Sequence, residues 1–414
     1  MFDLERWQEI FETLRKNKLR TFLTGLSVAS GIFILVILLG FSKGLENGVK
    51  SQFERDASNL ITVWTGVTTK GYKGLNPGRY VQMKNENFDF ISQKYKSNIE
   101  HETAIFSIWG AEITYKNENV NYQVRGVMPD HQFIENADME TGRFVNETDV
   151  EETRKVAVIG KKLRQDLFKD EDPINKEIKI YGISFKVVGV FIDPGGEREE
   201  QQAYIPLSTS QKVFGAGDNI NNILVTVKMS DNFEDAVTLS NNMSTAIETE
   251  LKQIHTVAPD DTSAVRVFNT LEEAKKIYSL IDTIQFVFWV IGVLTIIAGV
   301  VGVGNIMLII VKERTKEIGI RKALGALPLS IIGMILQEAI FVTMFAGLFG
   351  LIFGLGLLEI VGPPVQHDFL KYPQVDFNIA LSAVFVLVFA GAVAGFFPAY
   401  RAAKIKPIVA LRDE

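Results

Sequence analysis

Hydrophobic residues are concentrated in four long stretches of the chain. No Asp, Glu, Lys or Arg occurs in residues 21–42, 283–311, 339–358 or 377–400, so each stretch has 20 to 29 residues without a charged side chain. A helix needs about 20 such residues to cross a bilayer core of about 30 Å. Helices buried in water-soluble proteins rarely stay apolar on every side for so long. The pattern therefore predicts four transmembrane helices.

Residues 43–282, between the first two stretches, have a different pattern. Short segments rich in β-branched and aromatic residues predict strands at 60–64, 105–115, 120–127, 156–159, 177–181, 183–191 and 223–227. Helices are expected at 161–168 and 233–254, and mobile loops at 68–79 and 193–202, where Gly and Pro are frequent. This part of the chain is expected to form a large mixed α+β domain inserted between transmembrane helices 1 and 2.

Helical periodicity continues from both apolar stretches into this domain. Leu45, Val49 and Phe53 recur at four-residue spacing after the first stretch, and Thr270 and Glu273 have the spacing of a capping box before the second. The pattern predicts two stalk helices at the ends of the domain. It does not distinguish stalks that transmit movement from stalks that only support the domain.

The distribution of Lys and Arg predicts the orientation in the membrane. Five of these residues precede residue 21, five lie in 312–328 and four lie in 401–414, whereas loop 359–376 contains only Lys371. Because basic segments stay in the cytoplasm, both termini and 312–328 are expected there, and 43–282 are expected outside. The outer residues carry 28 basic and 37 acidic side chains, a balance that argues against a nucleic-acid partner.

These patterns predict the organisation of the whole chain. The first apolar stretch is too long for a cleaved signal peptide and is interpreted as an uncleaved anchor. In chain order we expect a cytoplasmic amphipathic segment (1–20), transmembrane helix 1 (21–42), the extracytoplasmic α+β domain with its stalks (43–282), transmembrane helix 2 (283–311), a charged cytoplasmic segment (312–328), transmembrane helix 3 (329–358), an extracytoplasmic loop (359–376), transmembrane helix 4 (377–400) and a cytoplasmic tail (401–414).

The sequence contains no convincing motif for catalysis, metal binding or ATP binding. Residues 40–44 match G-x-S-x-G, but an apolar helix precedes them where a nucleophile elbow needs a strand. The four histidines lack metal-ligand spacing, and the chain has no Cys. The adjacent carboxylates Asp260 and Asp261 are expected to be solvated. No phosphate-binding G-x-x-x-x-G-K-[ST] loop occurs, so we expect no catalytic residue, metal site or cofactor in this chain.

Small residues recur inside the last two apolar stretches. Gly350 with Gly354, and Gly391 with Gly395, form G-x-x-x-G pairs, a spacing that lets transmembrane helices approach closely. They are interpreted as helix-packing positions, and contacts within one chain and between two chains both remain open.

The segment VKERTKEIGIRKALGA, residues 311–326, carries seven charged side chains between two apolar stretches. Glu317 precedes Arg321 by four residues, the favourable order for an ion pair on a helix. Gly325 is suited to end that helix, and Pro328 to begin the next. The segment is therefore expected to form a short polar helix at the membrane, either as a docking element for a partner protein or as an anchor to lipid headgroups.

Residues 313–326 resemble a known family signature. They read ERTKEIGIRKALGA and are similar to the ERTxEIGIRxAxGA sequence of FtsX-like permeases of ABC transporters, in particular those of the macrolide-exporter (MacB) type. Further segments that fit this family are 141–149, 156–160, 167–168, 185–190, 205–208, 398–403 and 407–411. The family usually has Gly where this chain has Asn175, so the local turn is expected to differ.

The resemblance implies a dimeric permease of the bacterial inner membrane that converts ATP hydrolysis into movement of its periplasmic domain. It implies an ABC-type ATPase as partner, which would bind ATP and Mg²⁺, together with a periplasmic adaptor, an outer-membrane channel and membrane lipid. The macrolide exporter has its ATPase at the N-terminus, whereas about twenty residues precede the first apolar stretch here, so a separate ATPase is expected. The residues expected to couple to it are Glu313, Arg314, Glu317, Ile318, Gly319, Arg321, Lys322 and Gly325.

Three functions are compatible with this resemblance. Export of a periplasmic substrate is the leading hypothesis, because the large outer domain fits exporter-type relatives. Release of lipoproteins from the membrane and regulation of a cell-envelope enzyme by an FtsX-like signalling permease are the alternatives. The sequence does not identify the substrate.

Overall fold

A computed structural model describes residues 18–53, 58–229, 232–364, 370–375 and 377–406 of the 414-residue chain. The chain divides into two compact units, residues 1–50 with 278–414 and residues 51–277. Most of the predicted N-terminal segment 1–20 and part of the predicted tail 401–414 lie outside the described residues.

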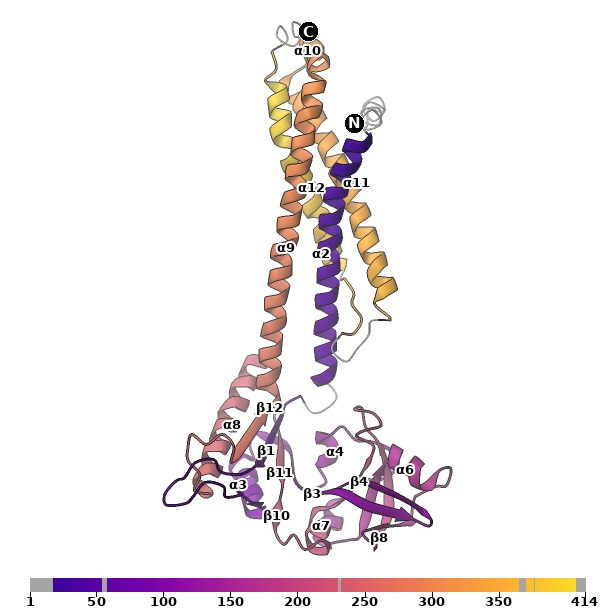
Figure 1. The fold of residues 1–414 in the computed structure, drawn as a ribbon, viewed down its shortest axis with the longest axis vertical. Coiled ribbons are helices and arrows are strands. Elements are labelled where there is room, and N and C mark those ends of the chain that lie inside the picture. The colour runs from indigo at the N-terminus through magenta and orange to yellow at the C-terminus, as the bar shows by residue number, and fades with distance from the viewer. Residues whose placement is uncertain (1–17, 54–57, 230–231, 365–369, 376, 407–414) are drawn as a thin grey trace. The chain divides into compact units, whose positions relative to one another are not determined.

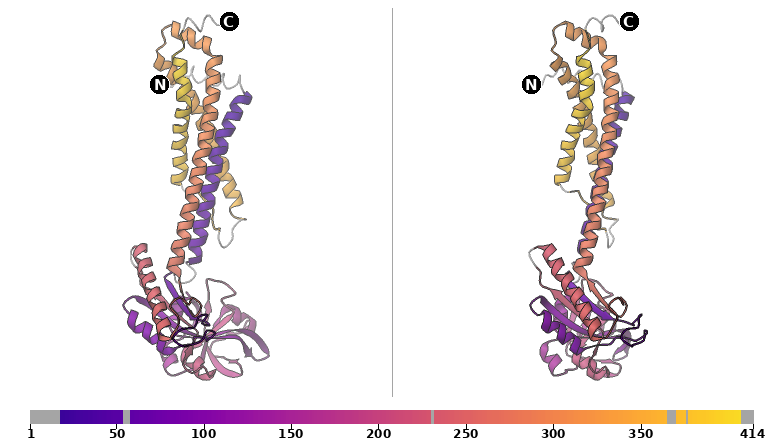
Figure 2. Two further views of the ribbon diagram at one scale, coloured as in Figure 1. Left: turned by 60° about the vertical axis from the view of Figure 1, so that its left-hand side comes forward. Right: turned by 90° about the vertical axis from the view of Figure 1, so that its left-hand side faces the viewer.

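The first unit is helical. It contains most of α2 (Lys18–Phe53) and α9 (Thr270–Glu313), and all of α10 (Thr315–Ala323), α11 (Pro328–Val361) and α12 (Phe377–Ala403). The long helices run side by side in Figures 1 and 2. Within the described residues, three segments are long and apolar enough to cross a membrane: Gly25–Lys50, Thr270–Glu313 and Pro328–Val361. The described apolar part of α12, Val388–Ala403, is shorter, so the fourth span stays a prediction.

Glycines lie at the close contacts between these helices. Gly350 and Gly354 of α11 face α2, and a Cβ atom at Gly350 would lie only 2.2 Å from the carbonyl oxygen of Ala29. Gly391 and Gly395 of α12 face α11, where a Cβ at Gly391 would lie 2.0 Å from a threonine hydroxyl. All four glycines therefore lie where two helices of this chain approach closely.

The second unit is built on a sheet of ten strands. The strand order is β12-β1-β11-β3-β4-β9-β6-β8-β5, and β7 pairs with β3 and β8. Two pairs, β4 with β9 and β6 with β8, are parallel. The strands are β1 (Leu60–Thr65), β3 (Ile99–Tyr115), β4 (Glu118–Val127), β5 (Asp138–Gly142), β6 (Val156–Gly160), β7 (Glu177–Ile180), β8 (Ile183–Ile192), β9 (Gln202–Pro206), β11 (Asn222–Val227) and β12 (Val265–Asn269), with β2 (Met83–Lys84) and β10 (Asn219–Ile220) as a separate pair.

The long strand β3 joins the two halves of this sheet. Its first part pairs with β11 and its second part with β4, with an irregular register between Ile108 and Ala111. Gly110, between these two residues, has φ of +61°, a conformation that favours glycine. Each half has its own apolar core. The helices of this unit are α3 (Asn85–Tyr95), α4 (His131–Ile134), α5 (Glu147–Glu151), α6 (Lys161–Phe168), α7 (Leu207–Val213) and α8 (Phe233–Ile254).

The amphipathic helix α8 covers the first half of the sheet. Met243, Ile247 and Leu251 recur at four-residue spacing and are buried in the core that α8 shares with β1, β11 and α3. This spacing places the three side chains on one face of the helix. Its observed bounds are those that the sequence pattern predicts, and the same is true of α6.

Two expectations about polar residues of the outer unit need correction. Asp261 is buried rather than solvated, and it accepts hydrogen bonds from the amides of Thr69 (2.7 Å) and Lys70 (3.1 Å). It thereby anchors one end of the predicted loop 68–79. Asn269, not Thr270, caps α9, because its Oδ1 accepts from the amide of Leu271 at 3.1 Å. An Asn side chain one residue earlier reaches the same free amides.

The turn at Asn175 keeps the backbone shape of a glycine. Asn175 has φ of +65°, in the left-handed region that Asn tolerates better than most residues. Its amide donates to the carbonyl of Val187 at 2.9 Å. Asn175 therefore adopts a conformation that Gly would also allow, and whether the turn differs from that of relatives stays a prediction.

Candidate functional site

The charged segment after α9 folds as a short helix between two longer ones. Arg314 separates α9 from α10, with φ of −93° and ψ of 11°. Gly325 has φ of +96° and follows the end of α10, and Pro328 is at the start of α11. The predicted cap and helix start are therefore confirmed. This arrangement holds α10 as a separate polar element at the end of the helical unit (Figure 1).

Arg314 lies at the centre of the charges in this segment. Its Nε and Nη2 atoms donate to the two carboxylate oxygens of Glu317, each at 2.9 Å, and its Nη1 donates to Glu338 at 3.3 Å. Arg321 also contacts Glu317, at 3.0 Å, so the predicted i to i+4 pair forms. Three of the seven charged side chains of this segment, Arg314, Glu317 and Arg321, therefore bond to one another.

Glu338 was not predicted as a site residue because it lies inside predicted transmembrane helix 3. Its side chain is 2% exposed, and its Oε1 atom accepts no hydrogen bond from the described residues. A buried carboxylate is costly unless it is paired. The contact with Arg314, 24 residues earlier in the chain, supplies that pairing.

Lys322 caps the C-terminal end of α12. Its Nζ donates to the carbonyl oxygens of Ala403 and Ile405, each at 2.7 Å. The last carbonyls of a helix have no partner within it, and a Lys side chain satisfies them well. Ile318 and Gly319 are also turned inward, and Ile318 packs in the core of the helical unit. These three residues therefore shape the segment rather than forming its outer surface.

Part of the outer surface of the segment is apolar. Leu324, Leu327 and Leu329 are 84%, 70% and 78% exposed, and Ile320 is 45% exposed. We call these four residues the apolar turn surface. Beside it lies a pocket of about 410 Å³ lined by Arg321, Leu324, Gly325, Ala326, Ser330, Ile331 and Met334. Reasoning from charge overlooked this surface, although the leucines of the sequence ALGALPL, residues 323–329, mark it.

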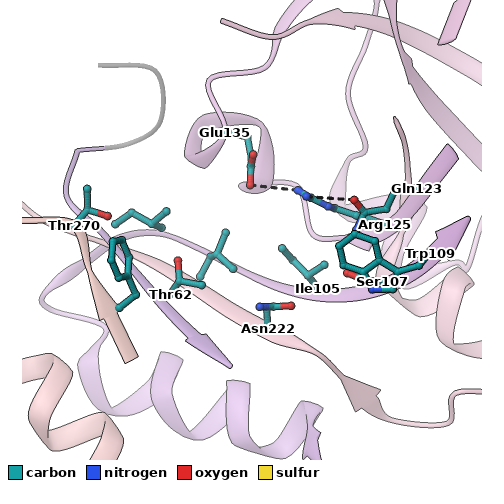
Figure 3. Close-up of a pocket in the computed structure, with 12 residues that line it drawn as sticks. Thr62, Ile105, Ser107, Trp109, Gln123, Arg125, Glu135, Asn222 and Thr270 are labelled. Atoms are coloured by element: carbon teal, nitrogen blue, oxygen red, sulfur yellow. Dashed lines mark hydrogen bonds and ion pairs between the residues drawn. The ribbon is translucent and has the colours of Figure 1, made fainter. Parts of the chain in front are cut away.

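A second pocket lies in the outer unit on an open face of the sheet (Figure 3). It has a volume of about 510 Å³, and its lining includes Ile105, Leu224 and Trp109. Arg125 and Glu135, which also line it, form an ion pair at 3.6 Å. Among the described residues, no group of three or more His, Asp or Glu side chains is arranged to hold a metal ion.

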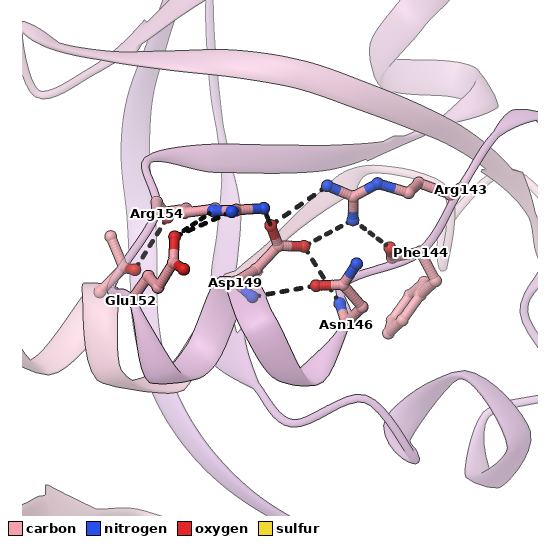
Figure 4. A network of polar contacts seen from close by, with 7 residues as sticks. Arg143, Phe144, Asn146, Asp149, Glu152 and Arg154 are labelled. Atoms are coloured by element: carbon pink, nitrogen blue, oxygen red, sulfur yellow. Dashed lines mark hydrogen bonds and ion pairs between the residues drawn. The ribbon is translucent and has the colours of Figure 1, made fainter.

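The outer unit also contains a buried polar network around Asp149 (Figure 4). Asp149 pairs with Arg143 and accepts from the amide of Asn146 at 3.1 Å, while the Asn146 side chain accepts from the amide of Asp149 at 2.9 Å. Burial alone raises the pKa of Asp149, but these hydrogen bonds and the charges of Arg143 and Arg154 lower it below its usual range. The network fixes the turn from β5 into α5, which explains the sequence in 141–149.

Long apolar helices, an α+β unit between the first two of them, and a short polar helix after the second define an integral-membrane permease. The family comparisons specify the class further. Residues 21–240 match the MacB-like periplasmic core domain, and residues 289–407 match the FtsX-like permease C-terminal region. The chain belongs to the MacB-like and FtsX-like family of ABC transporter permeases, as its sequence signature predicts.

Curated relatives align over nearly the whole chain. The macrolide export ATP-binding/permease protein MacB of Bdellovibrio bacteriovorus is 28% identical over 99% of this chain, and that of Chlorobaculum tepidum is 28% identical over 98%. The chain spans 62% and 61% of the lengths of these two relatives. An uncharacterized ABC transporter permease of Methanocaldococcus jannaschii is 27% identical over 98% of this chain and 96% of its own length.

A solved structure is similar to part of this chain. The periplasmic region of MacB from Actinobacillus actinomycetemcomitans aligns with 56% of this chain and 97% of its own, at 21% identity and a TM-score of 0.44.

Proposed function

We propose that this chain is the transmembrane subunit of an ABC transporter that drives export of a substrate from the periplasm. In this proposal a separate cytoplasmic ATPase binds ATP and Mg²⁺ and docks on the segment from Glu313 to Gly325. Closure of the ATPase displaces α10, and α9 transmits the displacement to the outer unit. The substrate is then moved without passing through the membrane helices.

The observation that carries the proposal is the apolar turn surface beside a short, internally braced helix. Exposed leucines at a membrane-protein segment rich in Lys and Arg are poorly placed for the aqueous phase, and burial of such residues is what stabilises protein interfaces. The family membership supports an ATPase as the occupant, because the curated MacB relatives are named as ATP-binding/permease proteins. The length of α9, 44 residues in one helix, supports its role in transmission.

The rest of the proposal follows from charge and family. The asymmetry of Lys and Arg favours cytoplasmic termini, four transmembrane spans and an outer unit in the periplasm of a bacterial inner membrane. We infer a dimer as the working form, with a periplasmic adaptor and an outer-membrane channel as further partners. Lys312 and Lys316 are exposed and are suited to lipid phosphates at the membrane surface.

The test is purification of the tagged chain with its native partners in a mild detergent. We expect an ABC-type ATPase to co-purify, and its ATP hydrolysis to depend on the permease. An adaptor and an outer-membrane channel in the same preparation would support export. Isolation with a cell-wall hydrolase, or without any ABC-type ATPase, would overturn the export proposal.

A further inference from the structure

The guanidinium of Arg314 is shared between carboxylates of two helices. It bonds both oxygens of Glu317 on α10 and only one oxygen of Glu338 on α11. Arg314 is also the residue at which α9 ends and α10 begins. One side chain therefore connects the end of the long helix α9, the short helix α10 and the first turns of α11.

The position of Glu338 is costly for a residue with only a structural role. It lies ten residues after Pro328 in α11, which is about 15 Å along the helix axis. Buried apolar residues, including Ile318, Ile331 and Ile335, already pack in the core of this helical unit, so cohesion alone does not require a carboxylate. Ionisable residues in membrane spans are rare, and they commonly mark functional positions.

The geometry also provides a second arrangement for Arg314. The Oε1 atom of Glu338 accepts no hydrogen bond from the described residues, so it is available to accept a second bond from Arg314. Bidentate contacts between Arg and a carboxylate are the strong form of this pair. Glu317 is 42% exposed and is accessible to a docked protein. Withdrawal of Glu317 toward that protein would favour the second arrangement.

We propose that Glu338 is a positioning residue for energy coupling. It holds Arg314 so that a displacement of α10 by the ATPase moves α9 and α11 together, and it accepts Arg314 when Glu317 engages the ATPase. The inference rests on the proposed function, because it requires an ATPase that docks on α10. Glu338 contacts neither ATP nor substrate in this scheme and acts only through Arg314.

The first test is Glu338→Gln in the full chain, purified with the ATPase that associates with the wild type. Gln preserves the side-chain volume, and Arg314 keeps its two bonds to Glu317, so insertion and ATPase association should be unchanged. The stimulation of ATP hydrolysis by the permease should fall about tenfold or more, because the neutral amide no longer balances the charge of Arg314. The control Glu359→Gln, at an exposed carboxylate of the same helix, should retain full stimulation. Full stimulation in Glu338→Gln would overturn the proposal.

A double variant separates positioning from structural support. Arg314→Met with Glu338→Leu replaces the charge pair by apolar side chains, a change that commonly preserves stability. We expect the double variant to insert and to unfold at the wild-type temperature, yet to stay uncoupled. Recovery of wild-type stimulation in it would show that Glu338 only supports the fold and would reject the positioning role. Absence of any ABC-type ATPase from the wild-type preparation would instead reject the proposed function, and this inference with it.

Discussion

Replacement of Leu324 by Ser should weaken ATPase docking without disturbing the permease. Leu324 is 84% exposed in the chain alone, so its removal leaves no cavity. Full burial of a Leu side chain contributes about 1.5–3 kcal/mol, and burial of the fraction exposed here contributes about 1.3–2.5 kcal/mol. This range corresponds to a rise in the Kd for the ATPase of about 10- to 70-fold. Leu327→Ser, at a residue 70% exposed, should have a slightly smaller effect.

The assay is a titration of the purified permease in lipid nanodiscs with its labelled ATPase. Leu75→Ser provides a matched control, because Leu75 is an exposed leucine of the outer unit that no cytoplasmic protein reaches in the proposed orientation. The control should leave the Kd unchanged. An unchanged Kd in both Leu324→Ser and Leu327→Ser would contradict docking through these leucines and would favour docking through the charged residues.

Exchange of charges is a less direct test of docking. The pair Glu317→Arg with Arg321→Glu keeps the net charge and the exposed i to i+4 pair, and reasoning from sequence suggests it as a probe of a protein interface. The structure shows that Glu317 also bonds Arg314. The exchange would place two guanidinium groups together inside the segment. Loss of docking in that variant would therefore report on the shape of α10 as much as on contact with the ATPase.

The membrane orientation, the packing of α11 against α12 and the charge of Asp149 can each be tested. The chain has no native Cys, so a Cys at Asn117 should react with an impermeant maleimide in intact cells, and one at Thr315 only after permeabilisation; the reverse pattern would invert the proposed orientation. Gly391→Val should lower the unfolding temperature, because overpacking costs about 1–3 kcal/mol. Gly356→Val should not lower it, because a Cβ atom at Gly356 would meet no atom of a neighbouring element within 4 Å. Equal effects of the two variants would contradict the close packing of α11 and α12. Asp149→Asn should destabilise the outer unit by about 1.5–3 kcal/mol, measured by hydrogen exchange. Because the pKa of Asp149 is lowered in the folded state, this difference should be complete above about pH 4 and vanish as the pH falls through that lowered pKa; a difference that persisted in acid would refute the charge-based account.

The sequence pattern predicts best those elements whose signal is local. The charge-free stretches identify the long helices because a bilayer sets a minimum length, and α6 and α8 have the predicted bounds. Strands such as β5, β9 and β12 are only five residues long, and no prediction identified them. β6 and β8 pair in parallel, and the alternation of apolar and polar residues along each strand does not predict which strands pair. Local pattern therefore identifies many elements but not the order of the sheet.

The candidate site shows the same limit. Spacing of four residues reveals the pair of Glu317 and Arg321, since both lie on one helix face. It gives no sign of the contact between Arg314 and Glu338, because that contact joins different helices. The sequence also presents every charge of the segment as available to a partner, whereas the fold directs Arg314 and Lys322 to internal acceptors. Only the three-dimensional structure distinguishes the charged side chains that bond within the chain from those that are exposed at its surface.

This separation also bears on the choice between protein docking and lipid anchoring. A charged helix at a membrane is compatible with both when its charges are counted together. Taken residue by residue, exposed Lys312 and Lys316 suit lipid phosphates, Arg314 and Lys322 bond to other helices, and the apolar turn surface is suited to the proposed protein partner. Ion pairs supply direction and geometry at an interface, while buried apolar area supplies most of its free energy. The segment therefore combines ion pairs that hold its shape with exposed leucines that suit an interface. These are the two properties that the proposed transmission of force from an ATPase requires.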